Sequence, residues 1–234
     1  MKKIFSGNKQ PSDTFRLTIL LSIVGGLLDA YTFLVRGKVL ANAQTGNIVY
    51  LAIYLGEGNI KKSIFYLFPI LAFGAGIFIS EVIRGKLEPK NIDNENYFHW
   101  RQIGVFIEII ILLIVGFISK GKWDIYVNVI VSFIAAIQYQ TFKKSNGVVM
   151  ATTMCTGNFR SSMEHLYIYT NTKNKKNLHL FLKYIGMIFS FILGGLLCVF
   201  LVNFLNTINQ SEKAVLAAIP ILLLVSYLMT KKKI

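Results

Sequence analysis

An aspartate interrupts the first apolar run of the sequence. Asp29 stands about fourteen residues into the run that extends from Phe15 to Val35. A carboxylate within such a run is costly unless it faces water or a polar partner, so it is a functional candidate by default. It could carry a proton or bind a cation. An ion pair with Arg36 or Lys38, just beyond the run, is the alternative, and we favour the functional interpretation.

Two polar segments further along the chain share a tripeptide. ANAQTGN (residues 41–47) and ATTMCTGN (residues 151–158) both end in Thr-Gly-Asn. Asn and Thr side chains can satisfy freed backbone groups or coordinate a ligand, and the glycines permit a turn. Gln138 and Gln140 precede the second segment much as Asp29 precedes the first. The predicted substrate-binding or ion-coupling residues are Asp29, Asn42, Gln44, Thr45, Gly46, Asn47, Gln138, Gln140, Thr153, Thr156, Gly157 and Asn158. The alternative is that they are polar contacts between helices and bind nothing.

The elements that position these residues are those of an all-α membrane protein. The 234 residues are 54% hydrophobic and only 15% charged, whereas a soluble domain carries roughly 25% charged residues. A bilayer core of about 30 Å needs roughly 20 apolar residues in a helix. We expect a cytoplasmic tail over residues 1–14 and a single membrane domain over 15–234. Six segments are predicted to span the bilayer: about 15–35, 62–83, 102–119, 124–142, 180–204 and 213–230.

The two polar segments decide the topology. Residues 37–56 and 147–169 are long enough to span, but each is polar through part of its length. We predict two short or broken helices that enter the membrane and return on the same side. This topology places both termini in the cytoplasm, and it puts more of the 25 Lys and Arg residues there than an eight-span topology does. Eight spans stay open as the alternative.

The chain also contains an internal repeat, with halves at about 15–119 and 124–230. Each Thr-Gly-Asn segment follows a spanning helix and precedes an apolar helix with closely spaced glycines, Gly74 and Gly76 or Gly194 and Gly195. With six spans, the first helices of the two halves run in opposite directions, so the halves are predicted to be inverted repeats. Polar interruptions at matching positions of inverted repeats indicate the central site of a transporter.

At these same segments the chain resembles a known family. GGLLDAYTFL (residues 25–34), GKVLANAQTGN (37–47) and TTMCTGN (152–158) resemble the YoaK family of small bacterial membrane proteins, which is classed as a domain of unknown function. The resemblance extends from about Leu17 to Tyr227. It implies a multi-pass protein of the bacterial inner membrane, and it implies no substrate.

The remaining charged residues have structural interpretations. Glu81 and Arg84 are predicted to form an ion pair at a helix end, and Glu108 is predicted to snorkel or to pair with Arg101. The formal net charge of +14 fits basic loops against anionic lipid better than nucleic acid, because no nucleic-acid-binding motif accompanies it.

The sequence favours a transporter. No catalytic motif, metal spacing or cofactor fingerprint is present, so we expect no enzyme activity, no cofactor and no metal. We predict a secondary transporter or permease for an unidentified small solute or ion. A channel is the first alternative, and a non-transporting membrane partner or sensor is the second. A homo-oligomer stays open.

Overall fold

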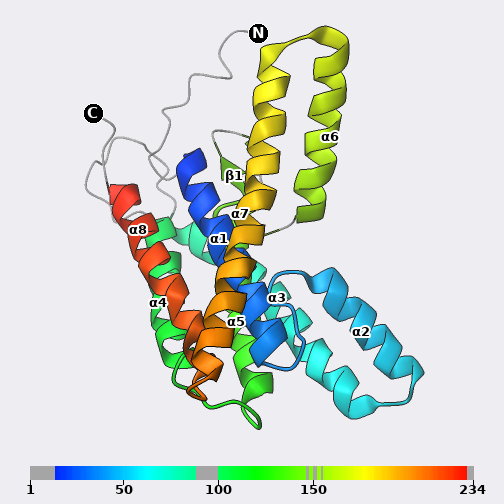
Figure 1. Ribbon diagram of the computed structural model, residues 1–234, viewed down its shortest axis with the longest axis vertical. Helices are drawn as coiled ribbons and strands as arrows, with labels where there is room; N and C mark the ends of the chain where they lie inside the picture. Colours follow the sequence, from blue (N-terminus) through cyan, green and yellow to red (C-terminus); the bar gives the residue numbers. More distant parts are fainter. Residues whose placement is uncertain (1–13, 88–99, 146–147, 150–151, 154, 231–234) are drawn as a thin grey trace.

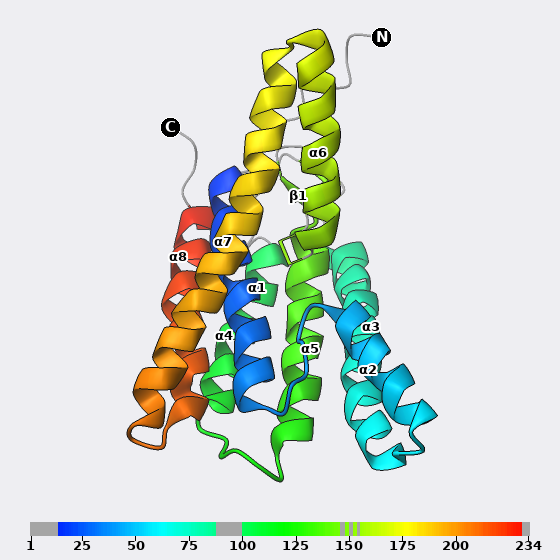
Figure 2. The same cartoon turned by 45° about the vertical axis from the view of Figure 1, so that its right-hand side comes forward.

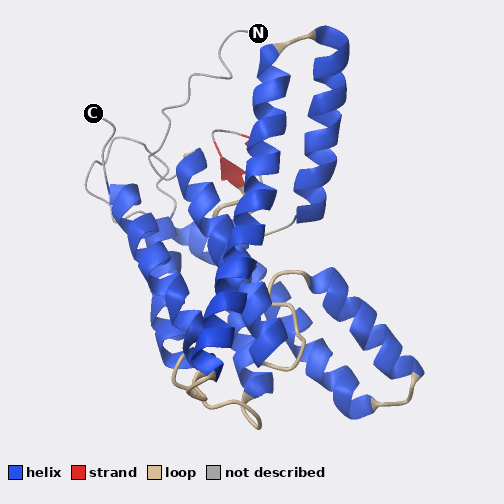
Figure 3. Ribbon diagram, in the orientation of Figure 1, coloured by secondary structure: helices blue, strands red, loops and turns tan. Residues whose placement is uncertain are grey.

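The protein is a bundle of helices with one small hairpin. The computed structural model describes residues 14–87, 100–145, 148–149, 152–153 and 155–230, and Figure 3 shows nearly all of them in helices. The helices are α1 (Phe15–Val35), α2 (Gln44–Gly56), α3 (Ile60–Leu87), α4 (Trp100–Val115), α5 (Asp124–Thr141), α6 (Cys155–Thr172), α7 (Lys175–Asn206), the 3-10 helix η2 (Ser211–Ala217) and α8 (Ala218–Thr230). Strands β1 (Lys144–Ser145) and β2 (Val148–Val149) form the antiparallel hairpin. The predicted helical class is confirmed. The predicted N-terminal tail, apart from Thr14, lies outside the described residues.

Four stretches of the described residues are long and apolar enough to cross a membrane. They are Phe15–Val35, Ile60–Lys86, Lys175–Asn206 and Ser211–Thr230, the last made of η2 and α8. The chain is therefore a helical membrane protein, but six spans are not confirmed. The helix predicted over 102–119 ends at Val115, and α4 has 16 residues. Helix α5 has the predicted position, but Asn128, Gln138 and Gln140 make it less apolar.

The distribution of polar and apolar side chains is that of a protein surrounded by lipid. Large apolar side chains point outward along the long helices, with Phe78 70% and Phe200 69% exposed. Polar side chains such as Asn128 and Ser132 are fully buried between helices. Helices satisfy their own backbone groups, so apolar side chains can face hydrocarbon while polar side chains connect the interior.

The two halves of the chain use the same set of helix pairs. Helix α2 packs on α3, and α6 packs on α7. The two most extensive helix contacts join the first half of the chain to the second. Helix α7 packs along α1, and α3 packs along α5. Helix α8 contacts α1, and α4 contacts α5. In Figure 2, α1, α2 and α4 run downward where α5, α6 and α8 run upward. Exchanging the halves therefore maps these pairs onto one another, with the direction of each helix reversed.

Glycines bring the crossing helices into backbone contact. Gly26 of α1 lies against the carbonyl of Phe191 in α7, and Gly194 of α7 lies against the carbonyl of Ile23 in α1. A Cβ atom at either glycine would collide with that backbone. Gly76 of α3 lies in the same way against the carbonyl of Phe133 in α5. The paired glycines of the sequence therefore serve close helix packing, as in many membrane proteins.

Candidate functional site

The segment before α2 turns back along α1. After α1 ends, the chain reverses at Gly37, with a φ of 89°, and Lys38, with a φ of 70°. It returns to the middle of α1, where the Asn42 backbone N–H donates to Asp29 Oδ1 at 2.6 Å. The Asn42 amide donates to the Gly25 carbonyl at 3.2 Å and to Asp29 Oδ1 at 3.3 Å. Helix α2 then leads away from α1 again from Gln44 (Figure 1), and the return of this segment to the same side of the membrane stays a prediction.

The segment before α6 reaches the same level of α1 from the other half of the chain. Thr153 packs against Gly25, where a Cβ atom would lie 2.6 Å from Thr153 Cγ2. Helix α6 begins two residues later at Cys155 and runs in the opposite direction to α2 (Figure 2). The absence of a side chain at Gly25 therefore lets both polar segments meet at the middle of α1.

A cavity of about 700 Å³ lies where the two segments meet. Its wall includes seven of the predicted site residues: Asp29, Asn42, Gln44, Thr45, Thr153, Thr156 and Gly157. Helices α1 and α7 contribute most of the remaining wall, α7 through Phe191, Ile192, Gly195 and Val199. Both Thr-Gly-Asn segments thus border one space, and each short helix begins beside it.

Two buried polar atoms at this cavity have no hydrogen-bond partner among the described residues. They are Oδ1 of Asn42 and Oγ1 of Thr153, whose residues are only 1% and 3% exposed. A buried polar group without a partner costs roughly 1–3 kcal/mol. One such atom comes from each half of the chain, and both belong to residues that line the cavity.

The asparagines of the two motifs lie behind the cavity wall. Asn47 Oδ1 accepts from the Leu40 N–H at 3.0 Å, and its amide donates to the Leu40 carbonyl at 2.6 Å and to Gln44 Oε1 at 2.9 Å. These bonds fix the returning segment to α2. Asn158 is also buried, and it is the fourth residue of α6 as Asn47 is of α2. The structure therefore gives Asn47 a positioning role.

The motif glycines do not make turns, contrary to the prediction. Gly46 and Gly157 lie in the first turns of α2 and α6, and neither has a positive φ. A Cβ atom at Gly46 would lie 2.7 Å from Leu40 Cδ1, whereas one at Gly157 would have nothing within 4 Å. The reversal is made by Gly37 and Lys38 instead, because the chain must turn where α1 ends.

The two glutamines of α5 lie away from the cavity wall. The Gln138 amide donates to the Leu21 carbonyl of α1 at 3.1 Å, and its Oε1 is buried without a partner among the described residues. The Gln140 amide donates to Glu81 Oε1. That oxygen also accepts from Lys143 at 3.0 Å and from Arg84 at 3.3 Å. The predicted Glu81–Arg84 pair is confirmed, and it belongs to a cluster that joins α3 to α5.

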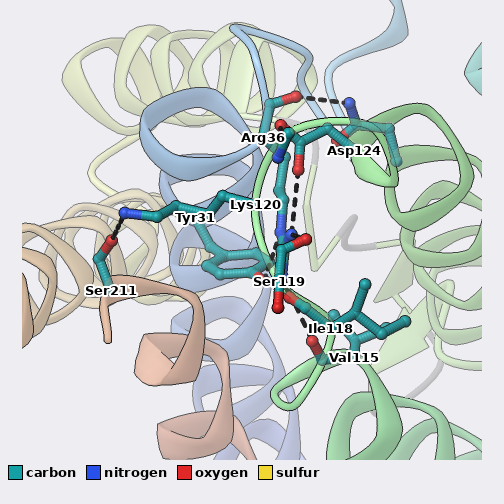
Figure 4. Close-up of polar contacts among 10 residues, drawn as sticks. Tyr31, Arg36, Val115, Ile118, Ser119, Lys120, Asp124 and Ser211 are labelled. Carbon is teal, nitrogen blue, oxygen red and sulfur yellow. Dashed lines mark hydrogen bonds and ion pairs between the residues drawn. The ribbon is translucent and has the colours of Figure 1, made fainter. Parts of the chain in front are cut away.

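A second buried polar cluster lies at the end of α1, and it corrects the alternative given for Asp29. The Arg36 guanidinium pairs with Asp124 at 3.0 Å, and no ion pair with Asp29 is found among the described residues. It also donates to Tyr31 Oη at 2.8 Å and to the carbonyls of Val115, Ile118 and Ser119 at 2.7–3.3 Å (Figure 4). Arg36 thereby caps the end of α4 and is not available to Asp29.

Glu108 is buried in the bundle, so the predicted snorkelling is wrong. The residue is 2% exposed, and its Oε1 has no partner among the described residues. No described ion pair joins it to Arg101, which lies over the Phe142 ring at 5.9 Å. Glu108 faces inward because the outward positions of α4 are apolar, as at Ile110 and Ile114.

Sequence reasoning missed three features of this region. Cys155 and the α7 residues Phe191 and Ile192 line the cavity, and Arg36 holds the nearby end of α1. The signal for α7 was present in Gly194-Gly195, because a glycine pair predicts a close helix partner. Nothing in the sequence indicated that this partner is the helix that carries Asp29. Among the described residues, no group of three or more His, Cys, Asp and Glu side chains is placed to hold a metal ion.

The family of the chain agrees with the resemblance in its motifs. No curated protein and no solved structure matches the chain. A family model does match, over residues 17–228, which include both polar segments and most of α1 and α8. The chain therefore belongs to the family described as protein of unknown function (DUF1275).

Proposed function

We propose that the protein is a secondary transporter or permease for a small solute, with its binding site in the cavity between α1, α7 and the two Thr-Gly-Asn segments. The observation that carries this proposal is the pair of unpartnered buried atoms, Asn42 Oδ1 and Thr153 Oγ1, on one cavity wall. Side chains that are buried, polar and unsatisfied beside an open space indicate a ligand that completes them.

An inverted repeat supports transport rather than mere binding. When the two halves are exchanged, each helix pair maps onto its counterpart. Gly76 of α3 packs against the backbone of α5 as Gly194 of α7 packs against the backbone of α1. Transporters built from such repeats place the substrate between the halves, at short helices that begin within the membrane. One half can then rock against the other and open the site to each side in turn.

The orientation follows from the charges. The Phe15 end of α1 and the Thr230 end of α8 lie on one side of the bundle, together with the α6–α7 turn (Figure 2). That side holds most of the basic residues among the described helices and turns: Arg16, Arg84, Lys86, Arg101, Lys143, Lys144, Lys173, Lys175, Lys176 and Lys183. We infer that this side is cytoplasmic, and that the membrane is the bacterial inner membrane that the family resemblance implies.

The test uses access to the cavity and needs no knowledge of the solute. Thr156 lines the cavity and is exposed. In a background with Cys155→Ser and Cys198→Ser, Thr156→Cys is labelled with a membrane-impermeant thiol reagent added to intact cells or to inverted vesicles. A transporter exposes the site to both faces, so labelling is expected from each.

Two matched variants calibrate the labelling. Thr172→Cys lies beside the α6–α7 turn and Thr207→Cys lies after α7, at opposite ends of the molecule. Each is expected to react from one face only, and the two from different faces. If Thr156→Cys reacts from a single face under all conditions, transport is excluded and the non-transporting alternative is favoured. A steady ion current through the purified protein in planar bilayers would favour a channel.

A further inference from the structure

The orientation of the Asn42 amide determines what the cavity can recognise. Its nitrogen donates to the Gly25 carbonyl, which can only accept, and to Asp29 Oδ1. The amide is therefore fixed with its nitrogen toward α1. The oxygen is left over, buried and without a partner among the described residues. An amide oxygen accepts hydrogen bonds and cannot donate them, so a ligand at this position must be a donor.

The formal charge of the wall has one sign. Asp29 is the one Asp or Glu among the described residues that line the cavity, and none of those residues is Lys or Arg. The nearest basic side chain along α1 is Arg36, whose guanidinium is engaged by Asp124, Tyr31 and three carbonyls. Within the part of the chain that the structure describes, the protein thus supplies a carboxylate that no Lys or Arg side chain pairs with. A donor that also carries positive charge completes the site better than a neutral one.

The first turns of α2 and α6 also border the cavity, and their partial positive charge favours anions. At α2 this partial positive charge is already balanced by the Asp29 carboxylate, which accepts the Asn42 N–H just before the helix at 2.6 Å. The partial positive charge of the α6 N-terminus remains, beside Thr156 and Gly157. A carboxylate on the wall favours a cationic partner more than the remaining helix end favours an anion, so the cationic class is favoured over the anionic class.

The size and the apolar part of the wall exclude a bare metal ion as the natural ligand. A cavity of about 700 Å³ is within the range of about 300–1,000 Å³ that holds small organic molecules. Its apolar part includes Phe33, Leu40, Phe191, Ile192 and Val199. A ligand that fills this space needs an apolar body beside its donor group.

We propose that the cavity binds a small organic solute with a protonated amino group and an apolar body, held by Asn42 Oδ1, Thr153 Oγ1 and the Asp29 carboxylate. The proposal rests on the proposed transport site and names its substrate class. The ammonium group donates to the two oxygens that lack partners, and its charge is balanced by Asp29. The apolar body lies against Phe191 and Ile192.

The test compares three probes that share a phenyl body and differ in charge. Purified full-length protein in detergent is titrated with 2-phenylethylamine, 2-phenylethanol or 3-phenylpropanoate, and with sodium chloride, while thermal unfolding is followed. A ligand that binds the folded state raises the unfolding temperature by mass action. The amine is expected to give a saturable rise, and the alcohol, the acid and sodium none.

Variants assign the effect to the site. Asp29→Asn is expected to abolish the rise given by the amine. Thr153→Val is expected to weaken amine binding by about tenfold or more, because it removes one hydrogen bond to a charged group. Thr172→Val removes a hydroxyl at the exposed end of α6 and should bind the amine as the unaltered protein does. The unfolding temperature of each variant without ligand reports whether it is folded.

The outcomes separate the ligand class from the transport proposal. Stabilisation by the acid alone, by sodium alone or by no probe overturns the amine assignment, as does an unchanged response in folded Asp29→Asn. None of these results affects labelling of Thr156→Cys from both faces. Conversely, specific amine binding together with labelling from a single face keeps the ligand class and overturns transport.

Discussion

Helix α1 carries two buried polar clusters that differ in how completely they are satisfied. At its end, all five N–H groups of the Arg36 guanidinium have acceptors, among them Asp124 and three carbonyls. At its middle, the cluster of Asp29, Asn42 and Thr153 lines a cavity and leaves two oxygens without partners among the described residues. A buried charge with every bond made depends on all of its partners, because the loss of one leaves an uncompensated charge. A buried cluster with bonds left over is available to a ligand.

Removing Arg36 should have the largest effect on stability. Arg36→Ala leaves Asp124, Tyr31 Oη and the carbonyls at the end of α4 without their donor. Removing one partner of a buried pair costs about 3–5 kcal/mol, and the free energy of unfolding is expected to fall by that amount. Titration with SDS followed by circular dichroism measures it. The exposed Lys122→Ala should change it by less than about 0.5 kcal/mol. Equal effects of the two variants would show that the Arg36 cluster does not hold α4.

The next largest effect concerns the contact that positions the cavity wall. Gly194→Ala places a methyl group against the Ile23 carbonyl and must push α7 away from α1. Such overpacking costs about 1–3 kcal/mol, measured by the same SDS titration. The adjacent Gly195→Ala is the matched control, since its Cβ would lie 3.8 Å from the nearest atom, the Gly26 carbonyl oxygen. It should leave stability unchanged or raise it by about 0.5–1 kcal/mol. A smaller loss for Gly194 than for Gly195 would contradict the observed packing of α1 on α7.

Glu108 is a third buried ionisable side chain, and it belongs to neither cluster. Because its Oε1 has no partner among the described residues, Glu108→Leu should raise the free energy of unfolding by about 1 kcal/mol. Glu108→Gln keeps an unpartnered polar group of the same shape, so it should give no comparable gain. SDS titration of the two variants side by side makes the measurement. A loss of stability in Glu108→Leu would mean that this carboxylate has a structural role like that of Arg36.

The sequence predicted the elements of the site better than its membrane topology. Asp29 and the two Thr-Gly-Asn segments were identified because polar residues within apolar runs are conspicuous, and the structure places both segments at one cavity. Which polar atoms face that cavity could not be predicted. Asn47 and Asn42 are equally polar in sequence, yet in the structure Asn47 lies behind the wall, where it makes three hydrogen bonds to Leu40 and Gln44. The topology was harder because α5 is stabilised by burial between helices rather than by an apolar surface.

The smallest effect on stability is expected at the cavity itself, where the same substitution can be compared at both clusters. Asp29→Asn keeps an oxygen that accepts the Asn42 N–H, so the free energy of unfolding should change by less than about 0.5 kcal/mol, as for sites without a lost partner. Asp124→Asn removes the charge that balances the fully buried Arg36 and should cost about 1.5–3 kcal/mol. SDS titration of both variants measures the two changes in the free energy of unfolding, so that they can be compared directly. If Asp29→Asn were as costly as Asp124→Asn, the carboxylate at the cavity would be a structural group like its counterpart. An unchanged fold combined with the loss of amine binding would instead separate the two clusters of α1 into one that holds the bundle and one that receives a ligand.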